Sequence, residues 1–188
     1  MFARGFKSWC ETAATQQRRL LKLHPSDPLD PRALAQSLGI QVWTPEQVPG
    51  FDRKHLDRVR ADRDGWSAVT LCMGAAHLII LNSSHRGGRP ASDLAHELSH
   101  ILLGYEPTRV DISKDGFLVL NTHDKQQEAE AAWLAGCLLF PREALVLIRR
   151  KGLDEQVAAR MYGASRDMLE YRLRMSGVDK QLRWARRA

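Results

Sequence analysis

Two histidines lie four residues apart in His96-Glu97-Leu98-Ser99-His100, with a glutamate directly after the first. On an α-helix of about 3.6 residues per turn, such histidines share one face, so both imidazoles can reach one metal ion. The glutamate then lies beside the ion, where its carboxylate can accept a proton from a bound water. The pattern predicts metal-assisted amide hydrolysis, with His96 and His100 as ligands and Glu97 as the general base.

The residues around this motif predict the helix that must carry it. Pro90 suits a first helical turn, and Gly104 is a typical C-terminal stop. Apolar residues form one stripe between them, made of Leu94, Leu98, Ile101 and Leu102. His96 and His100 fall on nearly the opposite side, so we expect the helix to pack by its leucines and to present its histidines to a cleft. The alternative is a pair of surface histidines on an amphipathic helix.

A third protein ligand is required, because catalytic zinc usually takes three and leaves a fourth position for water. The candidates are His77, His85, His123, Asp124, Glu128 and Glu130. On the helix expected from Lys125, Glu128 shares a face with Ala131, Ala132, Ala135 and Leu139. Small residues there let the two helices approach closely, so Glu128 is the predicted ligand. Glu130 points roughly 160° away and is expected to face outward. The alternative for Glu128 is a solvated glutamate in a first turn that favours acidic residues.

Two further side chains could act at the reacting carbonyl. His123 and Tyr105 are candidate donors to the oxyanion that forms there. The alternative for Tyr105 is a packing role just past the helix end, and the alternative for His123 is an ordinary loop histidine. His77 begins an apolar strand and is expected to be structural.

Composition indicates a globular protein of one domain, or of one domain with a small appendage. The chain has 188 residues, of which 44% are hydrophobic and 27% charged. No apolar run approaches the ~20 residues that cross a bilayer, and the first ten residues lack the apolar core of a secretory signal. Cys10, Cys72 and Cys137 are odd in number and widely spaced, which favours reduced thiols in a cytoplasmic protein.

The net charge of +6 is distributed unevenly. Its basic clusters are Arg18, Arg19 and Lys22; Arg149, Arg150 and Lys151; and Arg183, Arg186 and Arg187. A nucleic-acid surface is one interpretation, and solvated helix ends with a frayed tail are the other and favoured one.

The order of expected elements predicts an α+β fold, with a small antiparallel or mixed β-sheet packed on the HExxH helix and a helical C-terminal half. Strands are expected at 41–43, 66–73, 77–81 and 117–120, with a hairpin turn at 74–76. Helices are expected at 3–23, 32–38, 125–139, 141–150, 153–162 and 165–175. The charged stretch 52–64 has no clear period and is expected to be exposed. We divide the chain into an N-terminal helix and linker (1–30), a core (31–150) and a C-terminal helical segment with a basic tail (151–188).

Three motifs together resemble the ImmA/IrrE-type metallo-endopeptidases. His96–His100 is similar to HELGH, Glu128–Ala131 to the start of ExEA(N/D)xFA, and Leu138–Pro141 to LL(M/F)P. The resemblance implies a zincin-type, gluzincin-like site with one Zn²⁺ per chain, in which Glu128 is the third ligand. Ser99 replaces a glycine, Ala132 an asparagine or aspartate, and Leu134 a phenylalanine. Asp124 or His123 could supply the ligand-orienting contact that Ala132 lacks.

The resemblance also implies a protein substrate. Members of this family typically cut a helix-turn-helix repressor, often encoded beside them, and so release a stress, phage or mobile-element programme. One alternative is a DNA-associated or repressor-binding regulator that acts without proteolysis, because residues 153–162 and 165–175 have helix-turn-helix spacing. The second of these helices carries Arg166, Tyr171, Arg172 and Arg174. A packing stripe of Met168, Leu169 and Leu173 makes DNA binding the less favoured reading. Another alternative is a zinc hydrolase of small amides.

Overall fold

The computed structural model describes residues 2–50, 53–61, 65–73, 76–105, 110–112, 118–120 and 124–185. The strands are β1 (Gln41–Trp43), β2 (Ala68–Met73), β3 (Ala76–Leu81), β4 (Val110–Ile112) and β5 (Leu118–Leu120). The helices are α1 (Phe6–Leu20), α2 (Pro31–Ser37), α3 (Arg53–Ala61), α4 (Arg89–Leu102), α5 (Lys125–Leu139), α6 (Arg142–Arg150), α7 (Glu155–Met161), α8 (Arg166–Ser176) and α9 (Val178–Ala185), with a 3₁₀ turn at Pro45–Gln47. The α+β prediction is confirmed.

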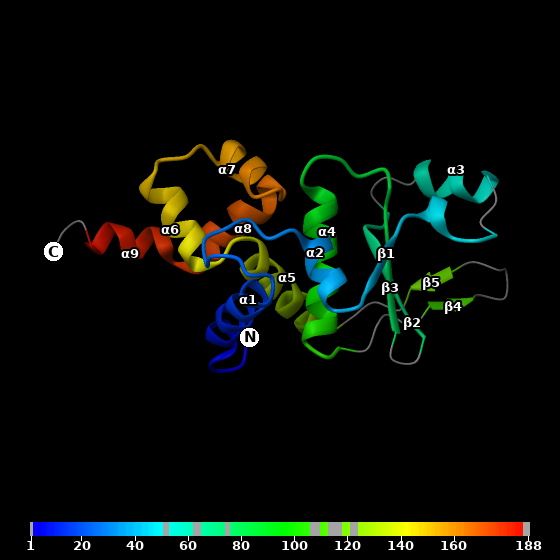
Figure 1. Ribbon diagram of the computed structural model, residues 1–188, viewed down its shortest axis with the longest axis horizontal. Helices are drawn as coiled ribbons and strands as arrows, with labels where there is room; N and C mark the ends of the chain where they lie inside the picture. Colours follow the sequence, from blue (N-terminus) through cyan, green and yellow to red (C-terminus); the bar gives the residue numbers. More distant parts are fainter. Residues whose placement is uncertain are drawn as a thin grey trace.

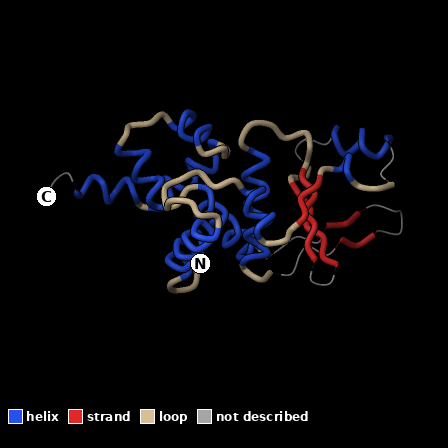
Figure 2. The backbone as a smooth tube through the Cα atoms, viewed as in Figure 1, coloured by secondary structure: helices blue, strands red, loops and turns tan. Residues whose placement is uncertain are grey.

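A small mixed sheet has the strand order β1-β3-β2. β1 runs parallel to β3, and β2 runs antiparallel to it, with Thr70 opposite Ile79. The predicted hairpin of β2 and β3 is confirmed, although residues 74 and 75 of its turn lie outside the described residues. β5 confirms the strand expected at 117–120, of which residue 117 lies outside the described residues, and β4, which pairs with β5, was not predicted. The strands gather at one end of the molecule, away from the C-terminus (Figure 2).

The HExxH helix α4 stands between the sheet and the group of helices that contains α1 and α5 to α9, whereas α3 lies on the far side of the sheet (Figure 1). It packs on β2 and β3, and also on α2 and α5. Leu94 and Leu98 are buried in the core, as the stripe predicted, and the helix ends before Gly104, whose φ of 71° is left-handed. The leucine stripe therefore anchors α4 and fixes which way its histidines face.

The helix α5 has the bounds expected for it and lies at the centre of the fold. It packs on α4, α1 and α8, and its residues from Glu130 to Leu139 are buried except for the half-buried Ala132. α1 and α8 thus join the predicted N-terminal and C-terminal segments to the predicted core. The division at residues 30 and 150 stays a prediction.

Two helices were not predicted from the sequence. The charged stretch 52–64 contains α3, because its arginine, lysine, leucine and alanine residues favour a helix without a regular apolar period. The basic tail contains α9, which packs on α6 and α8 and buries Val178.

Among the described residues no single helix is long and apolar enough to cross a membrane, although the bent pair of α5 and α6 passes that test by length and composition.

The charge clusters are only partly solvated. Arg18, which we expected at a solvated helix end, is 1% exposed, and its Nη2 donates to the Asp27 carbonyl. Burial lowers the pKa of Arg18 to about 10, since desolvation disfavours the charged form. Arg149 pairs with Glu155 and Asp179 and so joins three helices. These cations are therefore structural.

Arg172 on α8 is also buried rather than displayed. Its Nε donates to the Phe140 carbonyl, its Nη2 pairs with Glu11 of α1 at 2.6 Å, and its guanidinium lies over the Trp133 ring. Of the side chains that could have read DNA, Arg166 pairs with Glu170 on the same helix. The helix α8 thus uses its central arginine to hold α1 and α5.

Replacing Arg172 with Met should destabilise the protein by about 3 kcal/mol, because Glu11 and the Phe140 carbonyl lose a buried partner. The control is Arg166→Leu, which removes an exposed pair worth about 0.5 kcal/mol or less. Urea denaturation monitored by circular dichroism measures both free energies of unfolding. Equal losses would contradict the assignment of Arg172 as the tie between the three helices.

Candidate metal centre

The side chains of His96, His100 and Glu128 converge between α4 and α5. Their ligand atoms all lie within 4.8 Å of one another. The His96 Nε2 is 3.1 Å from the His100 Nε2 and 3.1 Å from a Glu128 oxygen, and the His100 Nε2 is 3.4 Å from the other Glu128 oxygen. The structure therefore brings together the three residues that the sequence nominated as ligands.

These spacings are close to those that one bound metal ion requires of its ligand atoms. An ion about 2.0–2.1 Å from each ligand atom separates neighbouring ligand atoms by about 3.3 Å. The two histidine nitrogens are 3.1 Å apart, and each lies within 3.4 Å of a different oxygen of Glu128. Two imidazole nitrogens and one carboxylate oxygen are also the donor set of many catalytic zinc sites.

Small residues bring the two ligand helices close together. Ala131 and Ala135 of α5 and Ala95 of α4 are at most 1% exposed. Ser99, which stands where the resembling family has glycine, is fully buried, and its hydroxyl donates to the Ala95 carbonyl at 2.7 Å. The serine therefore satisfies its own polar group within α4.

The centre is open on one side. The His100 side chain is only 4% exposed, whereas those of His96 and Glu128 are 27% and 44% exposed. Burial lowers the pKa of His96, but the hydrogen bond and the charge of Glu128 outweigh it, and the net pKa is raised. Glu128 is therefore the most accessible of the three side chains, and His100 the least.

The predicted base, Glu97, is held by a residue that the sequence did not nominate. Thr70 on β2 is 5% exposed, and its Oγ1 donates to the Glu97 Oε2 at 2.5 Å. Sequence spacing could not reveal this contact, because Thr70 and Glu97 are 27 residues apart and meet only when β2 packs on α4.

The expectation that Glu130 faces outward is wrong. Glu130 is 8% exposed and accepts hydrogen bonds from the Tyr105 hydroxyl and from the Gln126 Nε2. By helical geometry it lies on the side of α5 away from Glu128, but α5 is covered on most of its surface, so that side is also buried.

The Tyr105 ring lies 6.0 Å from the His100 ring. Burial and the bond to Glu130 raise the pKa of Tyr105 to about 12. Tyr105 and Glu130 together clamp the end of α4 to α5.

Replacing Tyr105 with Phe should weaken metal binding about 10-fold or more, because the clamp between the two ligand helices loses its donor. The control is Tyr162→Phe, which loses a similar hydroxyl bond, to the Ser26 carbonyl, outside the centre. Competition against a chromophoric chelator measures both affinities. The clamp is refuted if both variants bind zinc as the wild type does.

The remaining candidates have other positions. Asp124 is the N-cap of α5 and accepts from the Gln126 backbone amide. His123 lies outside the described residues. The His85 Nδ1 lies 2.5 Å from an Asp93 oxygen and ties the loop before α4 to that helix, and His77 belongs to β3. None of these belongs to the convergent group among the residues described.

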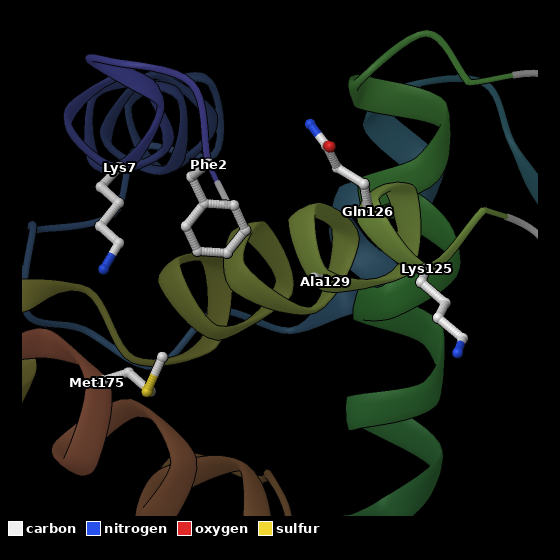
Figure 3. Close-up of a pocket in the computed structure, with 6 residues that line it drawn as sticks. All are labelled: Phe2, Lys7, Lys125, Gln126, Ala129 and Met175. Carbon is white, nitrogen blue, oxygen red and sulfur yellow. The ribbon is translucent and has the colours of Figure 1, made fainter.

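A groove lies on another face of α5, between α1 and α8 (Figure 3). Its lining consists of Phe2, Lys7, Lys125, Gln126, Ala129 and Met175. None of the convergent ligands lines it, so it is separate from the metal centre.

The geometry places two histidines of an HExxH helix and a carboxylate of a second helix where the three could hold one metal ion. In agreement with this, residues 35–174 match the model of the peptidase M78 family, described as the IrrE N-terminal-like domain. The chain belongs to this family of peptidases, and the resemblance to ImmA/IrrE-type proteins is confirmed. It matches none of the curated proteins with which it was compared. The family and the geometry support a metallopeptidase-type function.

Proposed function

We propose that this protein is a zinc-dependent endopeptidase of the cytoplasm that cuts a helix-turn-helix repressor. The observation that carries the proposal is the convergence of ligand atoms of His96, His100 and Glu128 to within 4.8 Å of one another, with Glu97 on the same helix as the histidines. Membership of the peptidase family supports the reaction type. One Zn²⁺ per chain fits the donor set.

Each residue of the centre has a distinct task. His96 and His100 hold the metal through their Nε2 atoms, and the Glu128 carboxylate completes the protein ligands. A bound Zn²⁺ would polarise the peptide carbonyl and would lower the pKa of a bound water toward about 7. Glu97 accepts the proton of the attacking water on its carboxylate and returns it to the leaving amine. Glu97 is outside the convergent group and its carboxylate accepts a hydrogen bond from Thr70, which favours the role of a base over that of a ligand.

An extended polypeptide fits the approach to this centre. Within the part of the chain that the structure describes, β2 pairs with β3 and no other strand. An edge strand of this kind can accept a further strand through its backbone groups. Because Thr70 of β2 contacts Glu97, a substrate added along that edge would pass beside the base. This arrangement favours a polypeptide over a small amide.

The choice of repressor rests on the family resemblance. Cutting such a repressor would release a stress, phage or mobile-element programme. The observed packing of α8 supports proteolysis over DNA binding as the main activity, since Arg172 and the half-buried Tyr171 face the core.

The test is to incubate the purified, zinc-loaded protein with the product of the adjacent repressor gene. We expect one discrete cut, identified by mass spectrometry, that a chelator abolishes and added zinc restores. Casein and a small chromogenic amide are tested in parallel. Cleavage of the small amide alone would overturn the endopeptidase assignment, and cleavage of casein without the repressor would overturn the choice of substrate.

A further inference from the structure

Thr70 lies on a buried face of the sheet where its neighbours Ile79 and Leu81 are apolar. In an antiparallel pair, directly opposed residues point to the same face of the sheet. Thr70 is opposite Ile79, and its neighbour pair on that face is Ala68 with Leu81. Ile79 and Leu81 are at most 3% exposed, and this face packs on α4. A valine would have the same shape and would fit here, so the hydroxyl needs a separate explanation.

The hydroxyl has one hydrogen-bond acceptor that accounts for its burial. Burying a hydroxyl without a partner costs free energy, and the Thr70 Oγ1 is instead 2.5 Å from the Glu97 Oε2. That length is typical of a hydroxyl that donates to an ionised carboxylate, which is among the stronger hydrogen bonds in proteins. The contact joins the edge strand β2 to the residue that moves the proton.

A glutamate needs such a constraint to act as a base. Its terminal torsion is broad, so a carboxylate on a helix surface samples many orientations. A donor on Oε2 fixes the plane of the carboxylate and hence the direction of Oε1. Proton transfer requires that the base lie within hydrogen-bond reach of the water, and a small misplacement of the reacting groups lowers the reaction rate strongly.

We propose that Thr70 is a positioning residue, whose hydroxyl holds the Glu97 carboxylate in the orientation that accepts the proton of the attacking water. This proposal rests on the proposed function. β2 would then have two tasks, since its edge takes the substrate and its buried face orients the base. Substrate and base would be aligned by the same strand.

The kinetic test compares Thr70→Val with Thr70→Ser in cleavage of the adjacent repressor. Thr70→Val keeps the shape and loses the donor, so kcat should fall about 10- to 100-fold while KM stays within about two-fold. Thr70→Ser keeps the donor and should recover most of kcat. The control is Thr15→Val, whose lost hydroxyl bond, to the Glu11 carbonyl, lies within α1. Zinc affinity should be unchanged in all three variants.

A second readout needs neither zinc nor substrate. In the metal-free protein, the melting temperature is measured for Thr70→Val, Glu97→Ala and the double variant. If the two side chains interact, Thr70→Val should lower the melting temperature less in the Glu97→Ala background than in the wild type. Additive shifts would overturn the contact.

The outcomes separate this proposal from the proposed function. A wild-type protein that binds zinc and cuts no polypeptide overturns the proposed function, and the role of Thr70 with it. If the wild type cuts the repressor and Thr70→Val has the same kcat, only the role of Thr70 is overturned. A Thr70→Ser variant as slow as Thr70→Val would also overturn it, because the donor is then irrelevant.

Discussion

Replacing Glu97 with Gln should lower kcat/KM by about 10²- to 10⁴-fold, the range that a positioned general base contributes. The amide has nearly the shape of the carboxylate but cannot accept the proton of water. Its oxygen can still accept the hydrogen bond of Thr70, so the packing of α4 against β2 should persist. Because Glu97 is not among the convergent ligand atoms, the variant should keep one zinc per chain.

The measurement combines cleavage kinetics on the repressor with zinc analysis by atomic emission. The matched control is Glu143→Gln, an exposed glutamate in the first turn of α6, which should cut at the wild-type rate. A Glu97→Gln protein that retains zinc and full activity would remove Glu97 from the mechanism. Loss of zinc together with activity would instead make Glu97 a ligand and would overturn its assignment as the base.

The predictable parts of this site are those that depend on a single helix. The spacing of His96 and His100 and the position of Glu128 on a small-residue face are properties of helical geometry, and the structure brings these three together. The bounds of α5 were also predictable, because a polar segment ending in Asp124 precedes a long run of good helix formers.

The contacts between elements were not predictable in the same way. The Thr70–Glu97 bond requires knowing the register of β2 and the side of the sheet that α4 covers. Glu130 was assigned to solvent because helical geometry gives a direction, but not what lies in that direction. Arg18 and Arg172 add to the net charge as any arginine does, and only their packing shows that they are buried. Tertiary structure decides all of these.

Replacing Glu128 with Ala should weaken zinc binding by at least about 100-fold, beyond the loss expected for a residue that only orients a ligand. The protein without metal should keep its fold, because the Glu128 side chain is 44% exposed and its removal opens no core cavity. A ligand present at 100 times its dissociation constant stabilises the folded state by about 2.7 kcal/mol. For a chain of this length, that corresponds to a rise in melting temperature of about 5–10 °C.

The two proteins can therefore be compared by thermal denaturation with and without zinc. The wild type should show this rise, and Glu128→Ala should show little or none at the same zinc concentration. Lys125→Ala, an exposed change on the same helix, is the control and should respond as the wild type does. An undiminished zinc response in Glu128→Ala would mean that another donor completes the centre, and the two histidines would then need a partner outside α5. A lost response with an unchanged metal-free melting temperature would instead assign the third ligand to α5, so that binding of the ion joins the two central helices of the fold.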